Sequence, residues 1–521
     1  MMSFFRSLCQ CVVGLVALTI TTEIRAEERA ATFAEIQVVD QETERGVPLV
    51  TLRTVDHQEF VTDSAGRVAI VDESLMRRPV FFYLQSHGYE YPPDGFGYRG
   101  TRVTLVPGQS IVLKIQRQNV AERLYRVTGE GIYRDSVLLG YDTPLAQPLG
   151  AGLVAGQDSV FGVPYAERIF WFWGDTARLS YPLGHFAMAG ATSPPVGQDG
   201  TRPAYGVDLT YFVDEAGFSR PMCRLDSERG VVWADGFTTV EDDDGRTRLV
   251  CHDVNLETMR KELSHGLAIY DDATERFVRL RSLEMSDRWR WPTQAHPIHV
   301  EMDGVKYLLM GDVYPTMRVP ARLADYQNPA AYEAWSCLSA DSTIEKPRLL
   351  RDDQGQIIWS WRKSTRPVDQ RVERRLVEQG LMQTDEARSN LRDVDTGKVV
   401  RLHRGSVHWN EYRRRWIMIA GEQGGDSELG EIWYAEADSP TGPWHRGVKI
   451  VTHRKYSFYN PVHHDFLDED GGRVIYFEGT YTATFSGNDH PTPRYDYNQI
   501  MYRLDLADER LKSVHERPVS R

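Results

Sequence analysis

Cysteine is scarce in this sequence. The 521 residues contain 5 cysteines, and Cys9 and Cys11 fall in the apolar N-terminal segment. The other three, Cys223, Cys251 and Cys337, are widely spaced, with no C-x-x-C pair and no Cys/His group at zinc spacing. A disulfide framework and a structural zinc site are therefore not expected.

An excess of positive charge is also lacking. The 61 Lys and Arg residues face 74 Asp and Glu residues, which gives a net charge of -13. Such a chain repels phosphate backbones and anionic lipid, so no nucleic acid is expected as a partner. The sequence has no G-x-S-x-G, P-loop or Rossmann fingerprint in a suitable context. A neutral, polyhydroxylated partner fits this composition better.

Only one apolar run near the N-terminus resembles a targeting segment. Residues 12–20 are too short to span a bilayer, and no second apolar segment follows them. This pattern predicts a signal peptide over residues 1–26, with cleavage after Ala26 and no membrane anchor after cleavage. The mature protein is expected to be secreted or periplasmic.

Residues 33–118 alternate apolar and polar positions in short runs separated by turn residues, which predicts half-buried strands. The order Thr43-x-x-Gly-Val-Pro-Leu-Val50, Phe60-Val-Thr-Asp-Ser-Ala-Gly-Arg67 and Gly88-Tyr89 resembles the transthyretin-like β-sandwich. In that family the module is usually an accessory, and this copy has no cluster of catalytic groups. We expect a spacer or binding accessory, followed by a linker or closure segment over residues 119–150.

A second pattern recurs five times over residues 151–517. In each copy a short strand and a hairpin turn precede an apolar run that ends in an acid, and a third and a weaker fourth strand follow. The five apolar runs occupy residues 169–175, 249–253, 307–312, 416–422 and 474–478. Four strands repeated five times predict an all-β fold with a five-bladed β-propeller.

One interval between the acids is too long. Asp312 and Glu422 are 110 residues apart, whereas the other consecutive acids are 56 to 78 apart. An insertion is therefore expected at residues 340–400, mainly helical, with a helix over residues 368–380 that begins after Pro367 and ends at Gly380. Strand direction predicts that this insertion covers the acidic rim as a lid or subsite wall.

Strand direction also predicts which residues meet. Successive antiparallel strands reverse, so the start of the first strand and the end of the second share one rim. The acids predicted there are Asp158, Asp175, Asp235, Asp253, Asp312, Glu422 and Glu478. The other side chains predicted nearby are His296, His463, His464, Tyr314, the loop 492–497 with Arg494 and Tyr495, and Trp359 and Trp361 of the insertion.

Carboxylates at such a rim suit glycosidic cleavage, in which one acid protonates the leaving oxygen and another acts as base or nucleophile. Proximity of like charges raises the pKa of one partner. Two other interpretations stay open, because strand-terminal Asp residues often only cap turns and an acidic funnel can bind structural Ca²⁺. No other cofactor or metal is expected. The predicted substrate-binding residues are Asp235, Asp253, His296, Asp312, Tyr314, Trp359, Trp361, His464, Arg494 and Tyr495.

Two segments resemble a known family. Trp171-Phe-Trp-Gly-Asp-Thr176 and Glu431-Ile-Trp-Tyr-Ala-Glu-Ala-Asp-Ser-Pro-Thr-Gly-Pro-Trp444 resemble the blade motifs of the five-bladed-propeller glycoside hydrolases, which include arabinanases, xylosidases and levansucrases. The Gly-Asp-Thr variant is similar to a largely uncharacterised group, some of whose members are endo-arabinanases. Gln157-Asp-Ser stands where the family has Arg-Asp-Pro.

This resemblance implies the catalytic roles. Asp158 and Asp175 would be the base or nucleophile and its electrostatic partner, and Glu422 or Glu478 would be the general acid. The expected function is a secreted glycoside hydrolase that acts on a polysaccharide or oligosaccharide. The alternative is a propeller that binds glycans without cleaving them.

Overall fold

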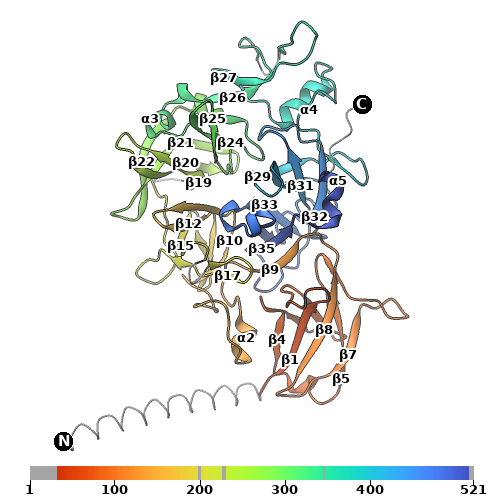
Figure 1. The fold of residues 1–521 in the computed structure, drawn as a ribbon. Helices are drawn as coiled ribbons and strands as arrows, with labels where there is room; N and C mark the ends of the chain where they lie inside the picture. The colour runs from red at the N-terminus through yellow and green to blue at the C-terminus, as the bar shows by residue number, and fades with distance from the viewer. Residues whose placement is uncertain (1–31, 198–200, 226–229, 344–345, 516–521) are drawn as a thin grey trace, which may run out of the picture. The chain divides into compact units, whose positions relative to one another are not determined.

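The computed structural model describes residues 32–197, 201–225, 230–343 and 346–515, and most of its regular structure is β-strand (Figure 1). The predicted all-β fold is confirmed. The predicted signal peptide lies outside the described residues. Within them, no helix has the length and apolar character needed to cross a membrane.

The chain forms two compact units. The first contains Met1–Gln118 and Gly131–Leu149, and the second contains Asn119–Glu130 and Gly150–Arg521. The predicted linker, residues 119–150, is therefore divided between the two units, because its first part contributes a strand to the second unit.

The first unit is built from two four-stranded sheets that enclose one core. One sheet has the order β4-β1-β8-β6, with bounds Arg67–Ile70, Ala34–Asp40, Ser110–Arg117 and Tyr89–Glu90. The other has the order β3-β2-β5-β7, with bounds Glu59–Val61, Thr51–Thr54, Pro79–Gln85 and Gly100–Thr104. Alternate residues point inward, so that Ile36, Leu52, Val68, Phe82 and Ile115 share the core. The short helix α2 (Arg134–Leu138) is attached through Ser136, whose N–H and hydroxyl both donate to Asp63 Oδ2.

The second unit contains five sheets of four or five strands, numbered here in chain order. Sheet 1 has β11 (Phe161–Tyr165), β12 (Arg168–Trp173), β15 (Ala189–Ser193) and β18 (Thr210–Tyr211). Sheet 2 has β19 (Val231–Glu241), β20 (Thr247–Thr258), β21 (Lys261–Asp271) and β22 (Arg276–Leu283). Sheet 3 has β23 (Ile298–Met302), β24 (Val305–Met310), β25 (Met317–Pro320), β26 (Glu333–Ser336) and β27 (Ser360–Arg362).

Sheets 4 and 5 end the chain. Sheet 4 has β29 (Leu402–Asn410), β30 (Arg415–Glu422), β31 (Ile432–Ala437), β32 (Arg446–Val451) and β28 (Arg392–Asp393). Sheet 5 has β33 (Ser457–His463), β34 (Val474–Thr482), β35 (Asn498–Asp505) and β9 (Glu122–Arg126). Two small sheets accompany them, β10 (Val154–Gln157) with β13 (Thr176–Arg178) and β14 (Tyr181–His185), and β16 (Thr201–Arg202) with β17 (Gly206–Val207). The remaining α-helices of the described chain are α3 (Leu323–Tyr326), α4 (Gln370–Glu378) and α5 (Lys512–His515).

The apolar side chains of these sheets pack between consecutive sheets. Phe172 of sheet 1 stacks on Phe237 of sheet 2 at a centroid distance of 4.4 Å. Further clusters join sheet 2 to sheet 3, the β24–β25 loop of sheet 3 to sheet 4, and sheet 5 to sheet 1. Sheets 4 and 5 meet along β29 and β33, where His463 N–H donates to Ser406 Oγ at 2.8 Å. Each sheet thus packs against the next, and the fifth packs against the first.

Sheet 5 is completed from the other end of the unit. β9 pairs antiparallel with β35, with Arg126 opposite Ile500 and Tyr125 opposite Met501 (Figure 1). Side chains of this sheet are almost all buried, which makes β9 part of the core.

The strand boundaries correct three predictions. The third strand of sheet 1 is β15, four residues after the expected start at His185, which ends β14 instead. β20 continues past Asp253 to Thr258, and β34 continues past Glu478 to Thr482. These two acids were expected at strand ends, but they lie within strands.

The insertion at residues 340–400 is not mainly helical. Its α-helix, α4, has 9 residues, starts after the N-cap Asp369 and stops before Gly380, whose φ is +70°. This helix agrees with the prediction over residues 368–380. The strands β27 and β28 also belong to the insertion. In β27, Trp361 pairs with Trp335 of β26, so this strand extends sheet 3 outward.

Candidate active site

Two aspartates meet at the start of sheet 1. Asp158 lies between β10 and β11, and Asp175 directly follows the β12 strand and Gly174. The Asp175 N–H donates to Asp158 Oδ1 at 2.9 Å, and the Gly174 N–H donates to the Asp158 carbonyl at 2.8 Å. Both aspartates are partly exposed. The structure therefore brings together the two acids predicted for the first repeat.

Glycine is required between the apolar strand and Asp175. A Cβ atom at Gly174 would lie 2.4 Å from Asp158 Oδ1. Any side chain there would push the Asp158 carboxylate away, so the Gly-Asp sequence is what permits the close approach of the two acids.

Aromatic side chains from two other sheets bind the pair. The Tyr459 hydroxyl donates to Asp158 Oδ2 at 2.9 Å, and Tyr497 also hydrogen-bonds to Asp158. Trp233 on β19 donates its indole N–H to Asp175 Oδ1 at 2.8 Å. The site therefore draws on sheets 1, 2 and 5.

The environments of the two carboxylates differ. Burial raises the pKa of Asp175 to about 7, and the negative charge of Asp158 adds to this effect, while the Trp233 hydrogen bond opposes it. Burial also raises the pKa of Asp158, but hydrogen bonds from Tyr459, the Asp175 backbone and Tyr497 all oppose that rise. Hydrogen bonds to a carboxylate stabilise its charged form. Asp158 is thus the acid whose charged form is more stabilised, and Asp175 is the acid that holds a proton near neutral pH.

The loop that carries Asp158 is fixed by sheet 5. The Ser159 N–H donates to Thr480 Oγ1 at 3.0 Å, and Gln499 Nε2 donates to the Gln157 carbonyl at 3.0 Å. Ser159 itself has a φ of +54°, in the left-handed region. The residues directly before and after Asp158 are therefore both hydrogen-bonded to sheet 5.

Glu478 and His464 form a separate, buried pair. His464 Nε2 lies 2.8 Å from Glu478 Oε1, and both side chains are at most 1% exposed. The His464 ring contacts Trp171 edge-on at a centroid distance of 5.1 Å. Glu478 was predicted at the rim, but because β34 continues past it, its carboxylate points into the protein.

His296 lies close to this pair. Its ring stacks on Phe161 of the innermost strand of sheet 1 at a centroid distance of 5.1 Å. Burial lowers the pKa of His296 to about 3, with smaller contributions from His464, His408 and Arg404. His296 is therefore neutral at physiological pH.

Asp235 starts a chain of histidines. Asp235 Oδ1 lies 3.1 Å from His252 Nδ1, and His252 Nε2 lies 3.2 Å from His265 Nδ1. The second carboxylate oxygen of Asp235, Oδ2, accepts the Gln294 N–H at 2.9 Å. Both Asp235 oxygens are therefore occupied by the protein.

Asp253 and Asp312 both bind arginine. Asp253 is 1% exposed in its side chain and is held by both terminal nitrogens of Arg279, at 2.5 and 2.8 Å. Asp312 follows β24, and its Oδ2 lies 3.2 Å from Arg371 and 3.6 Å from Arg404. Asp253 is thus a structural ion pair within sheet 2, whereas Asp312 remains partly exposed.

Glu422 ends β30 as predicted, but its contacts lie in sheet 4. Its Oε2 accepts the Trp433 indole N–H at 2.8 Å. Burial raises the pKa of Glu422, and the Trp433 hydrogen bond and Lys449 lower it. Neither Asp158 nor Asp175 contributes to this environment.

The remaining predicted binding residues are dispersed. Tyr314 and Tyr495 are 5% and 3% exposed, so they are core side chains, while Arg494 is exposed. Trp359 and Trp361 pack against Trp335 at centroid distances of 6.2 and 5.2 Å. Since β27 is four strands outward from β23, these tryptophans lie about 19 Å from the innermost strand.

Two residues of the site were absent from the sequence prediction, Tyr459 and Trp233. Trp233 lies two residues before Asp235 on the same face of a strand, so strand periodicity could have revealed it. Tyr459 is separated from Asp158 by 301 residues. Tyr497 fell in the predicted loop 492–497, without an assigned role.

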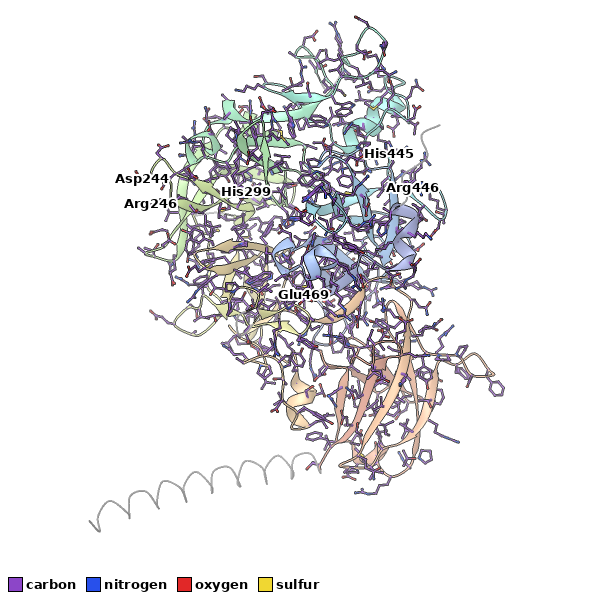
Figure 2. The ribbon with its side chains drawn as sticks, in the orientation of Figure 1. Asp244, Arg246, His299, His445, Arg446 and Glu469 are labelled. Carbon is purple, nitrogen blue, oxygen red and sulfur yellow. The ribbon has the colours of Figure 1, made fainter. Side chains whose placement is uncertain are left out.

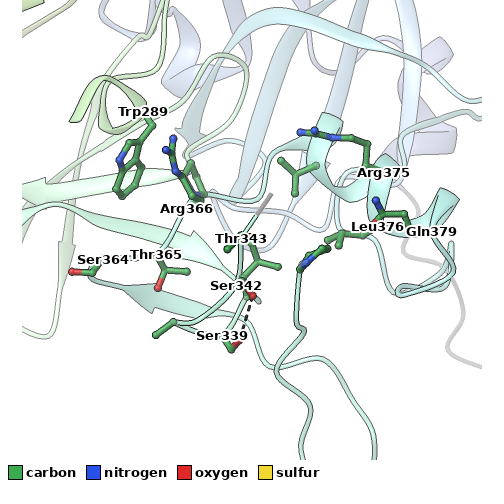
Figure 3. Close-up of a pocket in the computed structure, with 15 residues that line it drawn as sticks. Trp289, Ser339, Ser342, Thr343, Ser364, Thr365, Arg366, Arg375, Leu376 and Gln379 are labelled. Atoms are coloured by element: carbon green, nitrogen blue, oxygen red, sulfur yellow. Dashed lines mark hydrogen bonds between the residues drawn. The ribbon is translucent and has the colours of Figure 1, made fainter. Parts of the chain in front are cut away.

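Two cavities lie elsewhere in the second unit. One, of about 340 Å³, lies in the insertion and is lined in part by Trp289, Ser342, Arg366 and Arg375 (Figure 3). The other, of about 280 Å³, is lined in part by Asp312 and Arg404. Among the described residues, no group of three or more His, Cys, Asp or Glu side chains is arranged to hold a metal ion.

No family model matches the sequence, and no curated protein matches it. Solved structures that resemble this chain include a thermostable family-43 glycoside hydrolase, at 11% identity, with 68% of this chain and 90% of that chain covered and a TM-score of 0.32. An exo-β-1,3-galactanase from Phanerochaete chrysosporium shows 10% identity, coverage of 68% and 61%, and a TM-score of 0.33. An exo-1,5-α-L-arabinanase from a bovine ruminal metagenomic library shows 8% identity, coverage of 67% and 93%, and a TM-score of 0.33. At this level of similarity, the function of this chain has to be inferred from its own residues.

Proposed function

We propose that this chain is a secreted glycoside hydrolase that cleaves a polysaccharide or oligosaccharide. In this proposal the five sheets are the blades of a five-bladed propeller, and the first unit is a transthyretin-like sandwich that serves as an accessory. The observation that carries the proposal is the Asp158–Asp175 pair. Its two carboxyl groups are adjacent and partly exposed, and they differ in the number of hydrogen bonds that they accept.

The two acids divide the chemistry. Asp175, with a pKa raised to about 7 by burial and by Asp158, donates its proton to the glycosidic oxygen as the bond to the anomeric carbon breaks. Asp158, held as a carboxylate by its hydrogen bonds, acts as the base that activates water or as the nucleophile. In this scheme Asp175 takes the acid role that the family resemblance gave to Glu422 or Glu478.

The other predicted acids have supporting roles. Glu478 is fully buried and bound to His464, so we assign it to positioning that ring. Glu422 is the alternative general acid, because burial raises its pKa and it stays partly exposed. Trp233 and Tyr497 are partly exposed beside the Asp158–Asp175 pair and offer flat surfaces to a sugar ring, while the buried Tyr459 holds Asp158.

The test is a screen of the purified protein on arabinan, galactan, xylan and polygalacturonate for released reducing ends. The variants Asp158→Asn and Asp175→Asn should each lower turnover by about 10² to 10⁴-fold, because each removes a proton-transfer group while keeping its shape. The control is Asp244→Asn. Asp244 is an exposed side chain beside Arg246 in the turn between β19 and β20 (Figure 2), whereas Trp233, the β19 residue that binds Asp175, lies near the start of that strand.

Full activity in both Asp158→Asn and Asp175→Asn would remove the proposed role of the pair. Full loss in Glu422→Gln would move the acid role to Glu422. Binding of a glycan without any release of reducing ends would support a non-catalytic glycan-binding protein instead.

A further inference from the structure

The cavity beside Asp312 is rich in arginine. We call it the arginine pocket. Its lining residues are Asp312, Val313, Tyr314, Asp369, Gln370, Arg371, Arg374, Arg401, Leu402, His403, Arg404 and Gln423. They come from the β24–β25 loop, from α4 and its N-cap, from the start of β29, and from Gln423 directly after β30. A pocket of about 280 Å³ can hold a sugar-sized group.

Its charge is opposite to that of the whole chain. Four arginines and two aspartates line it, in a protein with a net charge of -13. Arg371 and Arg404 share Asp312, at 3.2 and 3.6 Å. Arg374 and Arg401 have no carboxylate within ion-pair distance among the described residues. The pocket therefore keeps two guanidinium groups that no acid in the described chain neutralises.

His403 adds an unused hydrogen-bonding group. Its Nδ1 is buried and has no hydrogen-bond partner among the described residues. Burial, with a smaller contribution from the neighbouring Arg404, lowers the pKa of His403 to about 4. The ring is thus neutral at physiological pH and can offer one N–H, while the arginines supply the charge.

The arginine pocket is connected to the Asp158–Asp175 pair along β19. Asp235 acts electrostatically on Arg404, and Arg404 donates to the Thr293 carbonyl at 3.0 Å. Two residues before Asp235, and on the same face of β19, Trp233 donates to Asp175. β19 thus carries one residue that acts on Arg404 and another that binds Asp175.

We propose that the arginine pocket binds an anionic substituent of the glycan, the carboxylate of a uronic acid or a sulfate ester, while the adjacent chain lies over Asp158 and Asp175. Planar guanidinium groups bind carboxylate and sulfate oxygens in a bidentate manner, and Arg374 and Arg401 are available for such contacts. The substrate class that follows is an acidic polysaccharide. This inference rests on the proposed function, since the same glycan occupies both sites.

The experiment measures binding of the full chain by calorimetry with three polymers, polygalacturonate, dextran sulfate and neutral dextran. We expect at least one anionic polymer to bind more tightly than dextran. Its affinity should fall as the salt concentration is raised from about 0.05 to about 0.5 M, because the Debye length, ~10 Å at 0.1 M, shortens and the charges are screened. A preference for polygalacturonate identifies carboxylate as the ligand, and a preference for dextran sulfate identifies sulfate.

The variants Arg374→Gln and Arg401→Gln should each weaken binding of the preferred polymer about tenfold, since each removes a charge-assisted contact. The matched control is Arg375→Gln. Arg375 follows Arg374 on α4 and is equally exposed, but it lines the other cavity (Figure 3). Substitution of these exposed arginines changes folding stability little.

Equal binding of all three polymers, or an equal loss of affinity in Arg375→Gln and Arg374→Gln, would overturn the arginine pocket as an anion site. The proposed function fails in a different way. If Asp158→Asn and Asp175→Asn keep full turnover, the catalytic pair is wrong even where the arginine variants lose affinity. If both aspartate variants are inactive but no anionic polymer is preferred, the catalytic pair stands and the arginine pocket is wrong.

Discussion

Asp175 and Asp253 arise from the same sequence pattern, an apolar run followed by an acid, but the structure treats them differently. Asp175 follows the end of β12 and stays partly exposed next to Asp158. Asp253 lies in the middle of β20, buried and bound by Arg279. The hydrophobic pattern alone does not distinguish them. The residue before each acid does, because Gly174 precedes Asp175 and His252 precedes Asp253.

The other repeats follow the same rule. Glycine also precedes Asp312 and Glu422, which lie at or just after strand ends, whereas Phe477 precedes Glu478, whose strand continues. At each of these glycines the chain comes close to another group. An added Cβ would lie 1.8 Å from the Tyr314 carbonyl oxygen at Gly311 and 2.8 Å from the His403 carbonyl oxygen at Gly421. Glycine thus marks the repeats in which the chain leaves the strand and exposes its acid.

The largest expected contrast is between Asp175→Asn and Asp253→Asn. The first should reduce turnover by about 10² to 10⁴-fold and leave the urea midpoint measured at about pH 4 close to that of the wild type, because at that pH Asn replaces a protonated acid of the same shape. The second should lower the free energy of unfolding by about 3 kcal/mol, because Arg279 then loses its buried partner. Its turnover per folded molecule should stay unchanged. Urea denaturation and initial rates on one glycan check both, and a stable Asp253→Asn protein without activity would contradict the distinction.

The next effect is expected from Gly174→Ala. The added methyl group would collide with the Asp158 carboxylate, so the two acids must move apart. A displacement of about 1 Å can cost about 100-fold in turnover. The control is Gly95→Ala, since a Cβ at Gly95 would meet no atom within 4 Å. Initial rates of the two variants measure this effect. Wild-type turnover in Gly174→Ala would show that activity does not depend on the close approach of Asp158 and Asp175.

The smallest effect concerns pH. Because Asp175 must be protonated to act as the acid and has a pKa of about 7, kcat should fall as the pH rises through 7. Trp233→Phe removes the hydrogen bond that favours the charged form, so the alkaline limb should move to higher pH by less than about one unit. A pH–rate profile of each protein measures this shift, and a move to lower pH would contradict the acid role of Asp175.

The same raised pKa also acts on stability. In the unfolded chain Asp175 ionises near its ordinary pKa, so the stability that its protonated form contributes is lost as the pH rises toward 7. Asp175→Asn does not titrate. The melting temperature of this variant relative to the wild type should therefore be higher at pH 8 than at pH 5.

Much of the fold could be predicted from the sequence, since alternation and turns located most strands of the repeats and the helix α4. The pairing of Asp158 with Asp175 could also be predicted, because both acids belong to one repeat. Tyr459 could not, since its contact depends on sheet 5 returning to sheet 1 after 301 residues. The tryptophans of the insertion were expected over the rim, but strand pairing with Trp335 places them at the outer edge of sheet 3.

The pairing of β9 with β35 has a consequence for how the protein is made. The strand that completes sheet 5 is synthesised first in this unit, and its partner Asn498–Asp505 lies near the C-terminal end of the chain. Until β35 has left the ribosome, β9 lacks its strand partner and sheet 5 is incomplete. Contacts of such long sequence separation slow folding. During synthesis, the edges of β9 and β34 that pair with β35 stay unpaired until β35 is made. A chain that ends before residue 498 would therefore expose a strand edge, which favours aggregation.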